Sequence, residues 1–131
     1  MTSKTKLDKL YYLFKSAGKY YVNETSDIIK QLNSQGESAL VGIQNKKGIY
    51  TIIGRNYVYY LTASGKKGKI PNEEFTEELN ENGRRIGTGW WQFTFRYKNI
   101  ILKNTDKVWL HHSETMFALL GIMIWMKKNK W

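Results

Sequence analysis

The spacing of apolar residues changes near residue 38, from the period of about 3.6 that is typical of helices to the period of about 2 that is typical of strands. Residues 39–44, 49–54 and 57–62 are rich in β-branched and aromatic side chains, and residues 69–71 begin a fourth such run. Gly or Asn stands in the turns between the runs. In the third run apolar side chains alternate to both faces, which predicts a sheet covered on both sides or a closed barrel.

The helical period predicts four helices. Residues 5–17 place four apolar side chains on one face, and residues 25–34 carry a shorter apolar stripe. Residues 72–82 predict a short acidic helix, because acidic side chains stabilise the first turn of a helix. The last helix has Ser113 as its cap and is apolar throughout residues 116–126, as is typical of a helix that is buried on all sides.

Strand character returns between the acidic helix and the last helix, in residues 90–97, 99–103 and 107–112. The predicted order is therefore two helices, four strands, a short helix, three strands and a long helix, which is an α+β arrangement. The 131 residues fit a single domain, since domains usually have roughly 100–200 residues.

This order resembles the pleckstrin-homology (PH) superfold, in its bacterial PH and GRAM-like branch. The resemblance covers residues 37–129. It is carried by Gly36-Glu37, the hairpin Gly48–Thr62, the short strand Lys69-Ile70-Pro71 and the helix after Trp109. It implies a PH-like antiparallel β-barrel of 4+3 strands over residues 37–131, to which the two predicted N-terminal helices would add a helical extension over residues 1–36. The C-terminal helix would close one end of that barrel, and the acidic helix would be an insertion in it.

The chain is strongly basic. Its 21 Lys and Arg side chains outnumber 11 Asp and Glu side chains, which gives a formal net charge of +10. Five of the acidic side chains lie within the stretch Glu73–Glu81, so the rest of the chain is more basic still. Such a charge concentrates polyanions, which include nucleic acids, phosphate-bearing ligands and anionic membrane surfaces. The stretch Glu73–Glu81 is in turn a candidate surface for a protein partner.

The absence of cysteine excludes a disulfide framework, a thiol nucleophile and a thiolate metal site. No segment has the ~18–20 continuous apolar residues of a membrane span, and the first residues lack the apolar core of a signal peptide. We therefore expect a cytoplasmic protein with no transmembrane segment, no cofactor and no metal.

Lysines recur in three of the expected turns, Asn45–Gly48, Ser64–Lys69 and Lys103–Lys107. The up-and-down strand order predicts that these turns gather at one end of the barrel. Lysine ammonium groups beside backbone N–H groups flanked by glycine can hold phosphate oxygens. The PH-like resemblance implies that the first two turns supply anion ligands. With the third turn added, the predicted ligand-binding residues are Lys46, Lys47, Lys66, Lys67, Lys69, Lys103 and Lys107.

Two other interpretations stay open beside this one. The first is a nucleic-acid-binding accessory protein of a phage or other mobile element, because basic and aromatic side chains interleave around residues 84–97, as stacking of unpaired bases beside a phosphate backbone requires. Its predicted contacts are Arg84, Arg85, Trp90 and Arg96.

The second is a small basic ribonuclease, in which His111 or His112 acts as general acid or base with Arg84 or Arg85 and Glu114. The two histidines do not favour a shared metal site, because neighbours on a strand point to opposite faces. The sequence favours a non-enzymatic binding module that recognises an anionic, phosphate-bearing ligand through its basic turns.

Overall fold

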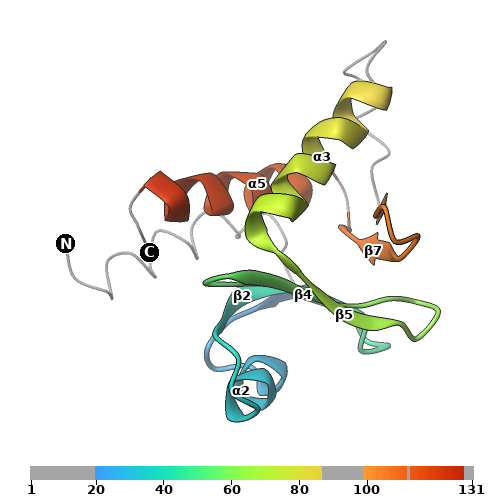
Figure 1. Cartoon of the computed structure of the whole chain (residues 1–131). Helices are drawn as coiled ribbons and strands as arrows, with labels where there is room; N and C mark the ends of the chain where they lie inside the picture. The colour runs from blue at the N-terminus through green and yellow to red at the C-terminus, as the bar shows by residue number, and fades with distance from the viewer. Residues whose placement is uncertain (1–19, 87–98, 112, 129–131) are drawn as a thin grey trace.

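The computed structural model describes residues 20–86, 99–111 and 113–128 (Figure 1). Strands β1 to β5 form one antiparallel sheet in chain order, and β6 and β7 form a second, two-stranded sheet. In chain order the elements are β1 (Tyr21–Val22), α2 (Asp27–Ser34), β2 (Ala39–Gln44), β3 (Tyr50–Gly54), β4 (Tyr57–Leu61), β5 (Lys67–Pro71), α3 (Asn72–Ile86), β6 (Asn99–Ile101), β7 (Lys107–Trp109) and α5 (Ser113–Lys128).

The described elements form three layers, with the five-stranded sheet in the middle (Figure 1). Helix α2 covers one face of the sheet, where Ile29 packs with Ile52 and Tyr59. Helices α3 and α5 and the β6–β7 hairpin cover the other face. We refer to the core on this second face as the larger core. Its buried side chains come from the sheet (Val41, Ile43, Ile53, Val58, Tyr60, Ile70), from α3 (Phe75, Leu79), from the hairpin segment (Ile100, Leu102, Val108, Leu110) and from α5 (Ile122, Met123, Met126).

The predicted PH-like barrel of 4+3 strands is wrong. Within the described ranges the five-stranded sheet is open, with β1 and β5 at its edges, and the β6–β7 hairpin forms a separate sheet. The apolar side chains on both faces of β4 fit the other arrangement predicted from the sequence, a sheet that is covered on both sides. Val58 and Tyr60 face the larger core, whereas Tyr59 faces α2. Because helices bury both faces, the apolar pattern does not require the sheet to close.

The predicted layout of two helices before the first strand is also wrong. Strand β1 precedes α2 and pairs with β2, with Tyr21 opposite Ile43, so the first 36 residues contribute a strand to the sheet. Helix α3 continues through Gly83 to Ile86, beyond the predicted end at residue 82. A glycine weakens a helix by only about 1 kcal/mol relative to alanine, which tertiary packing can offset. The predicted helix 5–17 and strand 90–97 lie outside the described residues.

Helix α5 begins at Ser113, the residue that the sequence predicts as its cap. Its buried residues Ile122, Met123 and Met126 pack on the larger core, while Ile124 is 55% exposed. No helix in the described part of the chain combines the length and the apolar character needed to cross a membrane.

Three hairpin turns share one backbone form. In each, the N–H of the fourth residue donates to the carbonyl of the first, as in Gly48 to Asn45 (3.0 Å), Gly65 to Thr62 (3.0 Å) and Thr105 to Leu102 (2.8 Å). The fourth residue has a positive φ in all three: 88° for Gly48, 90° for Gly65 and 75° for Thr105. Glycine adopts this conformation without strain, whereas a β-branched residue does so at an energetic cost.

We expect Thr105→Gly to raise the free energy of unfolding by about 0.5–1 kcal/mol. The strain energy of the left-handed conformation that is relieved in the folded state exceeds the stability that is lost because glycine adds conformational entropy to the unfolded chain. Gly65→Ala is the matched control. It introduces strain at an equivalent position where a Cβ meets nothing within 4 Å, so it should destabilise. Urea denaturation of both variants measures the two effects, and a loss of stability in Thr105→Gly would contradict this account of the turn.

Candidate anion-binding surface

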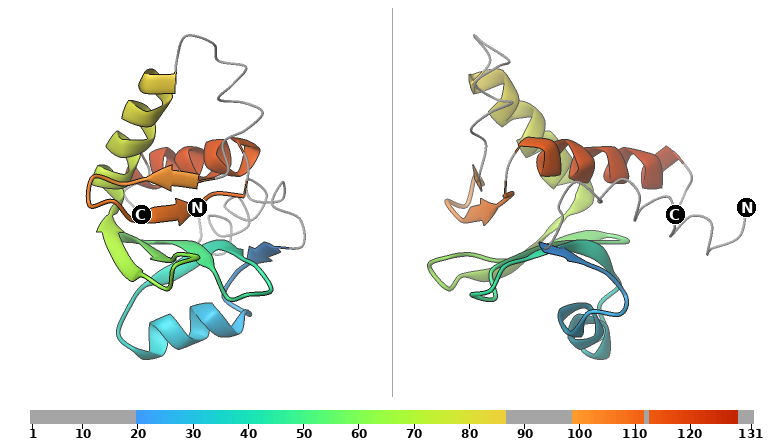
Figure 2. Two further views of the ribbon diagram at one scale, coloured as in Figure 1. Left: turned by 90° about the vertical axis from the view of Figure 1, so that its right-hand side faces the viewer. Right: turned by 180° about the vertical axis from the view of Figure 1, so that it is seen from behind.

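The β2–β3 and β4–β5 turns lie at the same end of the large sheet. Tyr50, the first residue of β3, pairs with Gln44 at the end of β2 and with Leu61 at the end of β4. The β6–β7 turn also lies on this side of the molecule (Figure 1). Seen from that side, all three turns face the viewer (Figure 2, left). We refer to the six lysines of these turns, Lys46, Lys47, Lys66, Lys67, Lys103 and Lys107, as the basic end.

A hydrogen bond from the large sheet holds the β6–β7 turn in this position. Tyr60 of β4 is only 2% exposed, and its hydroxyl donates to Asp106 Oδ2 at 2.6 Å. The Asn104 amide donates to the same hydroxyl oxygen at 3.4 Å, and Lys66 Nζ lies 3.8 Å from Asp106 Oδ1. Burial, followed by the hydrogen bond to Asp106, raises the pKa of Tyr60 above its ordinary value. The hydroxyl therefore keeps its proton and remains a donor at neutral pH.

A glycine makes room for this contact. Gly68 of β5 pairs with Tyr60, and a Cβ at Gly68 would lie 2.6 Å from the Tyr60 hydroxyl oxygen and 2.8 Å from Cζ. Both distances are shorter than side chains tolerate, so glycine at position 68 lets the Tyr60 ring reach Asp106.

Helix α3 supplies a second polar contact to the same turn. Glu78 is 6% exposed, and its Oε1 accepts a hydrogen bond of 2.7 Å from the backbone N–H of Lys103. The predicted acidic surface Glu73–Glu81 is thus partly internal: Glu73, Glu74 and Glu77 are exposed, but Glu78 points into the protein. The side chain of Glu81 lies outside the described residues. Glu78 and Tyr60 together fix the turn that carries Lys103 and Lys107.

The basic end has an excess of positive charge. All six of its lysines are exposed, and the carboxylates in direct contact with its turns are Asp106 and Glu78. Within the described ranges, no carboxylate lies at ion-pair distance from Lys46, Lys47, Lys67 or Lys107. These ammonium groups are therefore open to an external anion.

Several backbone N–H groups of the turns are used within the turns. Asn45 Oδ1 accepts from Lys47 (2.9 Å) and Ile49 (3.1 Å), and Thr62 Oγ1 accepts from Lys66 (3.0 Å). Asn104 Oδ1 accepts from Asp106 at 2.9 Å. These N–H groups are therefore not available to a ligand, which would meet the exposed lysine side chains of the turns.

Lys69 has a different environment from the other predicted lysines. It lies within β5, and its Nζ is 3.1 Å and 3.3 Å from the two carboxylate oxygens of Glu37. It also lies 4.6 Å from the centroid of the Tyr57 ring. The hydrogen bond to Glu37 is the main reason why the pKa of Lys69 is raised. The structure thus places Lys69 with a carboxylate beside α2 and does not bring it to the basic end.

Most residues of the two alternative interpretations cannot be placed in a site. Arg84 and Arg85 lie in the last turns of α3. Trp90, Arg96 and His112 lie outside the described residues. His111 follows β7 and has a positive φ of 68°. Within the described part of the chain, no group of three or more His, Cys, Asp or Glu side chains could hold a metal ion.

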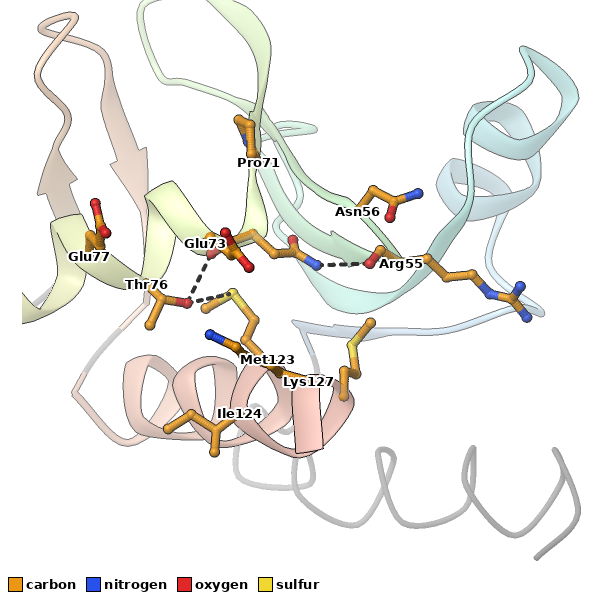
Figure 3. A pocket seen from close by; sticks show the side chains of 11 residues that line it. Arg55, Asn56, Pro71, Glu73, Thr76, Glu77, Met123, Ile124 and Lys127 are labelled. Carbon is orange, nitrogen blue, oxygen red and sulfur yellow. Dashed lines mark hydrogen bonds between the residues drawn. The ribbon is translucent and has the colours of Figure 1, made fainter. Parts of the chain in front are cut away.

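A cavity of about 480 Å³ lies elsewhere, between the β3–β4 turn, the start of α3 and the end of α5 (Figure 3). Its lining combines apolar side chains with charges of both signs, from Glu73 and Glu77 on α3 and from Arg55 and Lys127. Asn72 closes one wall by donating to the carbonyls of Gly54 (3.0 Å) and Arg55 (3.2 Å). The sequence did not reveal this cavity, because it exists only where α3 and α5 pack together. Its mixed charge does not match an anionic ligand.

Comparisons with known proteins add no family. No family model matches this sequence, and neither a curated protein nor a solved structure matches it. The resemblance to PH and GRAM-like domains therefore stays an untested prediction at the level of the family.

We expect Tyr60→Phe to lower the free energy of unfolding by about 1–3 kcal/mol, because Asp106 would lose the buried hydroxyl that donates to it. Tyr57→Phe is the control. Tyr57 lies on the same strand, and no hydrogen bond of its hydroxyl is found among the described residues. Chemical denaturation of both variants measures the difference. Equal effects of the two substitutions would show that the Tyr60–Asp106 contact does not hold the hairpin.

Proposed function

We propose that this protein is a non-enzymatic binding module for phosphate-bearing anions, with the basic end as its contact surface. The observation that carries the proposal is the position of the lysines: three turns from different parts of the chain lie on one side of the molecule and carry six exposed lysines. Four of these lysines have no carboxylate at ion-pair distance within the described ranges. A surface of one sign attracts oppositely charged ligands and raises their rate of association.

The frame beneath the lysines supports this role. The Tyr60–Asp106 hydrogen bond and the Glu78–Lys103 contact fix the third turn relative to the sheet. The first two turns are fixed by the strand register. A ligand that spans the turns therefore meets backbones that are already in place and has only lysine side chains to order.

The chemistry of lysine defines the kind of binding. An ammonium group is a compact, strongly hydrated charge on a flexible stem, which contacts phosphate without the two-point geometry of arginine. Binding by such groups depends on release of counterions, so its affinity falls steeply as salt rises. We propose that the protein acts in the cytoplasm, where phosphate-bearing polymers are abundant.

Charge reversal at the basic end tests the proposal. The variant Lys46→Glu/Lys47→Glu/Lys67→Glu alters lysines without an ion pair in the described ranges. The control Lys30→Glu/Lys127→Glu/Lys128→Glu changes the net charge equally at exposed positions on α2 and α5. With labelled inorganic polyphosphate at low salt, we expect the first variant to bind at least about tenfold more weakly than the control. Circular dichroism checks that both are folded.

The comparison between the two variants decides the outcome. Equal weakening in both would show that net charge alone attracts the polyphosphate and that the turns form no site. Unchanged binding in the turn variant would also overturn the proposal.

A further inference from the structure

Three partly exposed rings from two distant segments of the chain meet at one place in the structure. Tyr20 comes directly before β1, Trp109 ends β7, and His111 follows two residues later. The ring centroids are 5.4 Å apart for Tyr20 and Trp109, 4.7 Å for Tyr20 and His111, and 5.8 Å for Trp109 and His111. The three rings thus form one compact cluster, which we call the ring cluster.

The strand pairings place the ring cluster beside the basic end. Tyr20 adjoins Tyr21, which pairs with Ile43, only three residues before Lys46. The carbonyl of Trp109 accepts a hydrogen bond from Thr51 Oγ1, and Thr51 is the β3 partner of Ile43. In the view onto the turns, β1 and the end of β7 lie near the β2–β3 turn (Figure 2, left).

The rings are anchored on their inner side. Tyr20 and Trp109 both pack against the larger core, yet each remains partly exposed. His111 is held with a φ of 68°, a conformation that is uncommon for residues other than glycine. Backbone strain of this kind persists only where the surroundings impose it, and it concentrates at functional sites. Anchored rings lose little conformational entropy when a flat ligand group stacks on them.

Aromatic rings beside lysines are the combination that single-stranded nucleic acids require. The backbone phosphates contact the cations, and unpaired bases stack on the rings. In a duplex the bases are already stacked on one another, so they are not available to the cluster. We propose that the ring cluster of Tyr20, Trp109 and His111 stacks an unpaired base, which makes the ligand of the basic end a single-stranded nucleic acid. This inference rests on the proposed function.

The test separates the bases from the phosphates. The probes are a labelled oligothymidylate of about 12 nucleotides, within the ~4–16 nucleotides that such surfaces cover, and an abasic strand of equal length. The two strands carry the same phosphates, but only the first has bases. We expect the unaltered protein to bind oligothymidylate at least about fivefold more tightly, which corresponds to one stacked base. Equal affinities would overturn the inference without the use of any variant.

Variants of the ring cluster then locate the contact. Tyr20→Leu removes a ring, and His111→Asn removes another while it retains a residue that tolerates positive φ. Each should weaken oligothymidylate binding by about 5- to 100-fold and leave binding of the abasic strand unchanged. The control Tyr57→Leu removes a partly exposed ring from the opposite face of the sheet and should change neither affinity.

The remaining outcomes distinguish this inference from the function on which it rests. If the ring variants bind oligothymidylate normally while the Lys46/Lys47/Lys67 variant does not, the base contact is refuted and the anion surface stands. If neither kind of variant weakens binding, both fail. Tighter binding to anionic phospholipid vesicles than to oligothymidylate, reduced by Tyr20→Leu, would refute nucleic acid in favour of a lipid surface.

Discussion

The hydrogen bond between the Tyr60 hydroxyl and Asp106 joins the two sheets at the end of the molecule where the lysines gather. It connects the middle of the large sheet to the turn of a hairpin that comes much later in the chain. Gly68 leaves space for the Tyr60 ring, and Glu78 holds the neighbouring backbone of Lys103. These contacts add to the apolar packing of the hairpin and to the hydrogen bond from Thr51 Oγ1 to the carbonyl of Trp109. The arrangement of charge therefore depends on a small number of buried polar contacts.

Local features of the fold could be read from the sequence, whereas the pairing of layers could not. β-branched and aromatic runs predicted strands near residues 39–44 and 57–61, and Gly48 and Gly65 marked turns that require a positive φ. The prediction of a barrel was wrong because apolar residues on both faces of β4 fit either a sheet that closes into a barrel or a sheet that is covered by helices. The choice depends on α2 and α5 lying on opposite faces, which is a tertiary property that no single segment encodes.

The same limit applies to the candidate site. The position of lysines in turns was visible in the sequence, and an antiparallel register is enough to bring the first two turns to one end. The partner of Lys69 was not visible, because Glu37 lies on a distant loop. In the sequence Glu78 does not differ from its exposed acidic neighbours, because only the packing of α3 against the hairpin buries it. The ring cluster joins Tyr20 to residues 109–111, which are far apart in the chain, so no local pattern predicts the cluster. Of its three residues, the sequence singled out only His111, and for a different role.

The central claim is that three separate turns act as one surface for phosphate-bearing anions. Amide chemical shifts recorded while inorganic polyphosphate is added to the ¹⁵N-labelled protein test it most directly. We predict that residues 45–48, 62–67 and 103–107 shift together with one apparent affinity, while residues 28–34 on α2 and 122–128 on α5 do not. Shifts spread over all exposed lysines, or confined to the cavity beside Lys127, would contradict it.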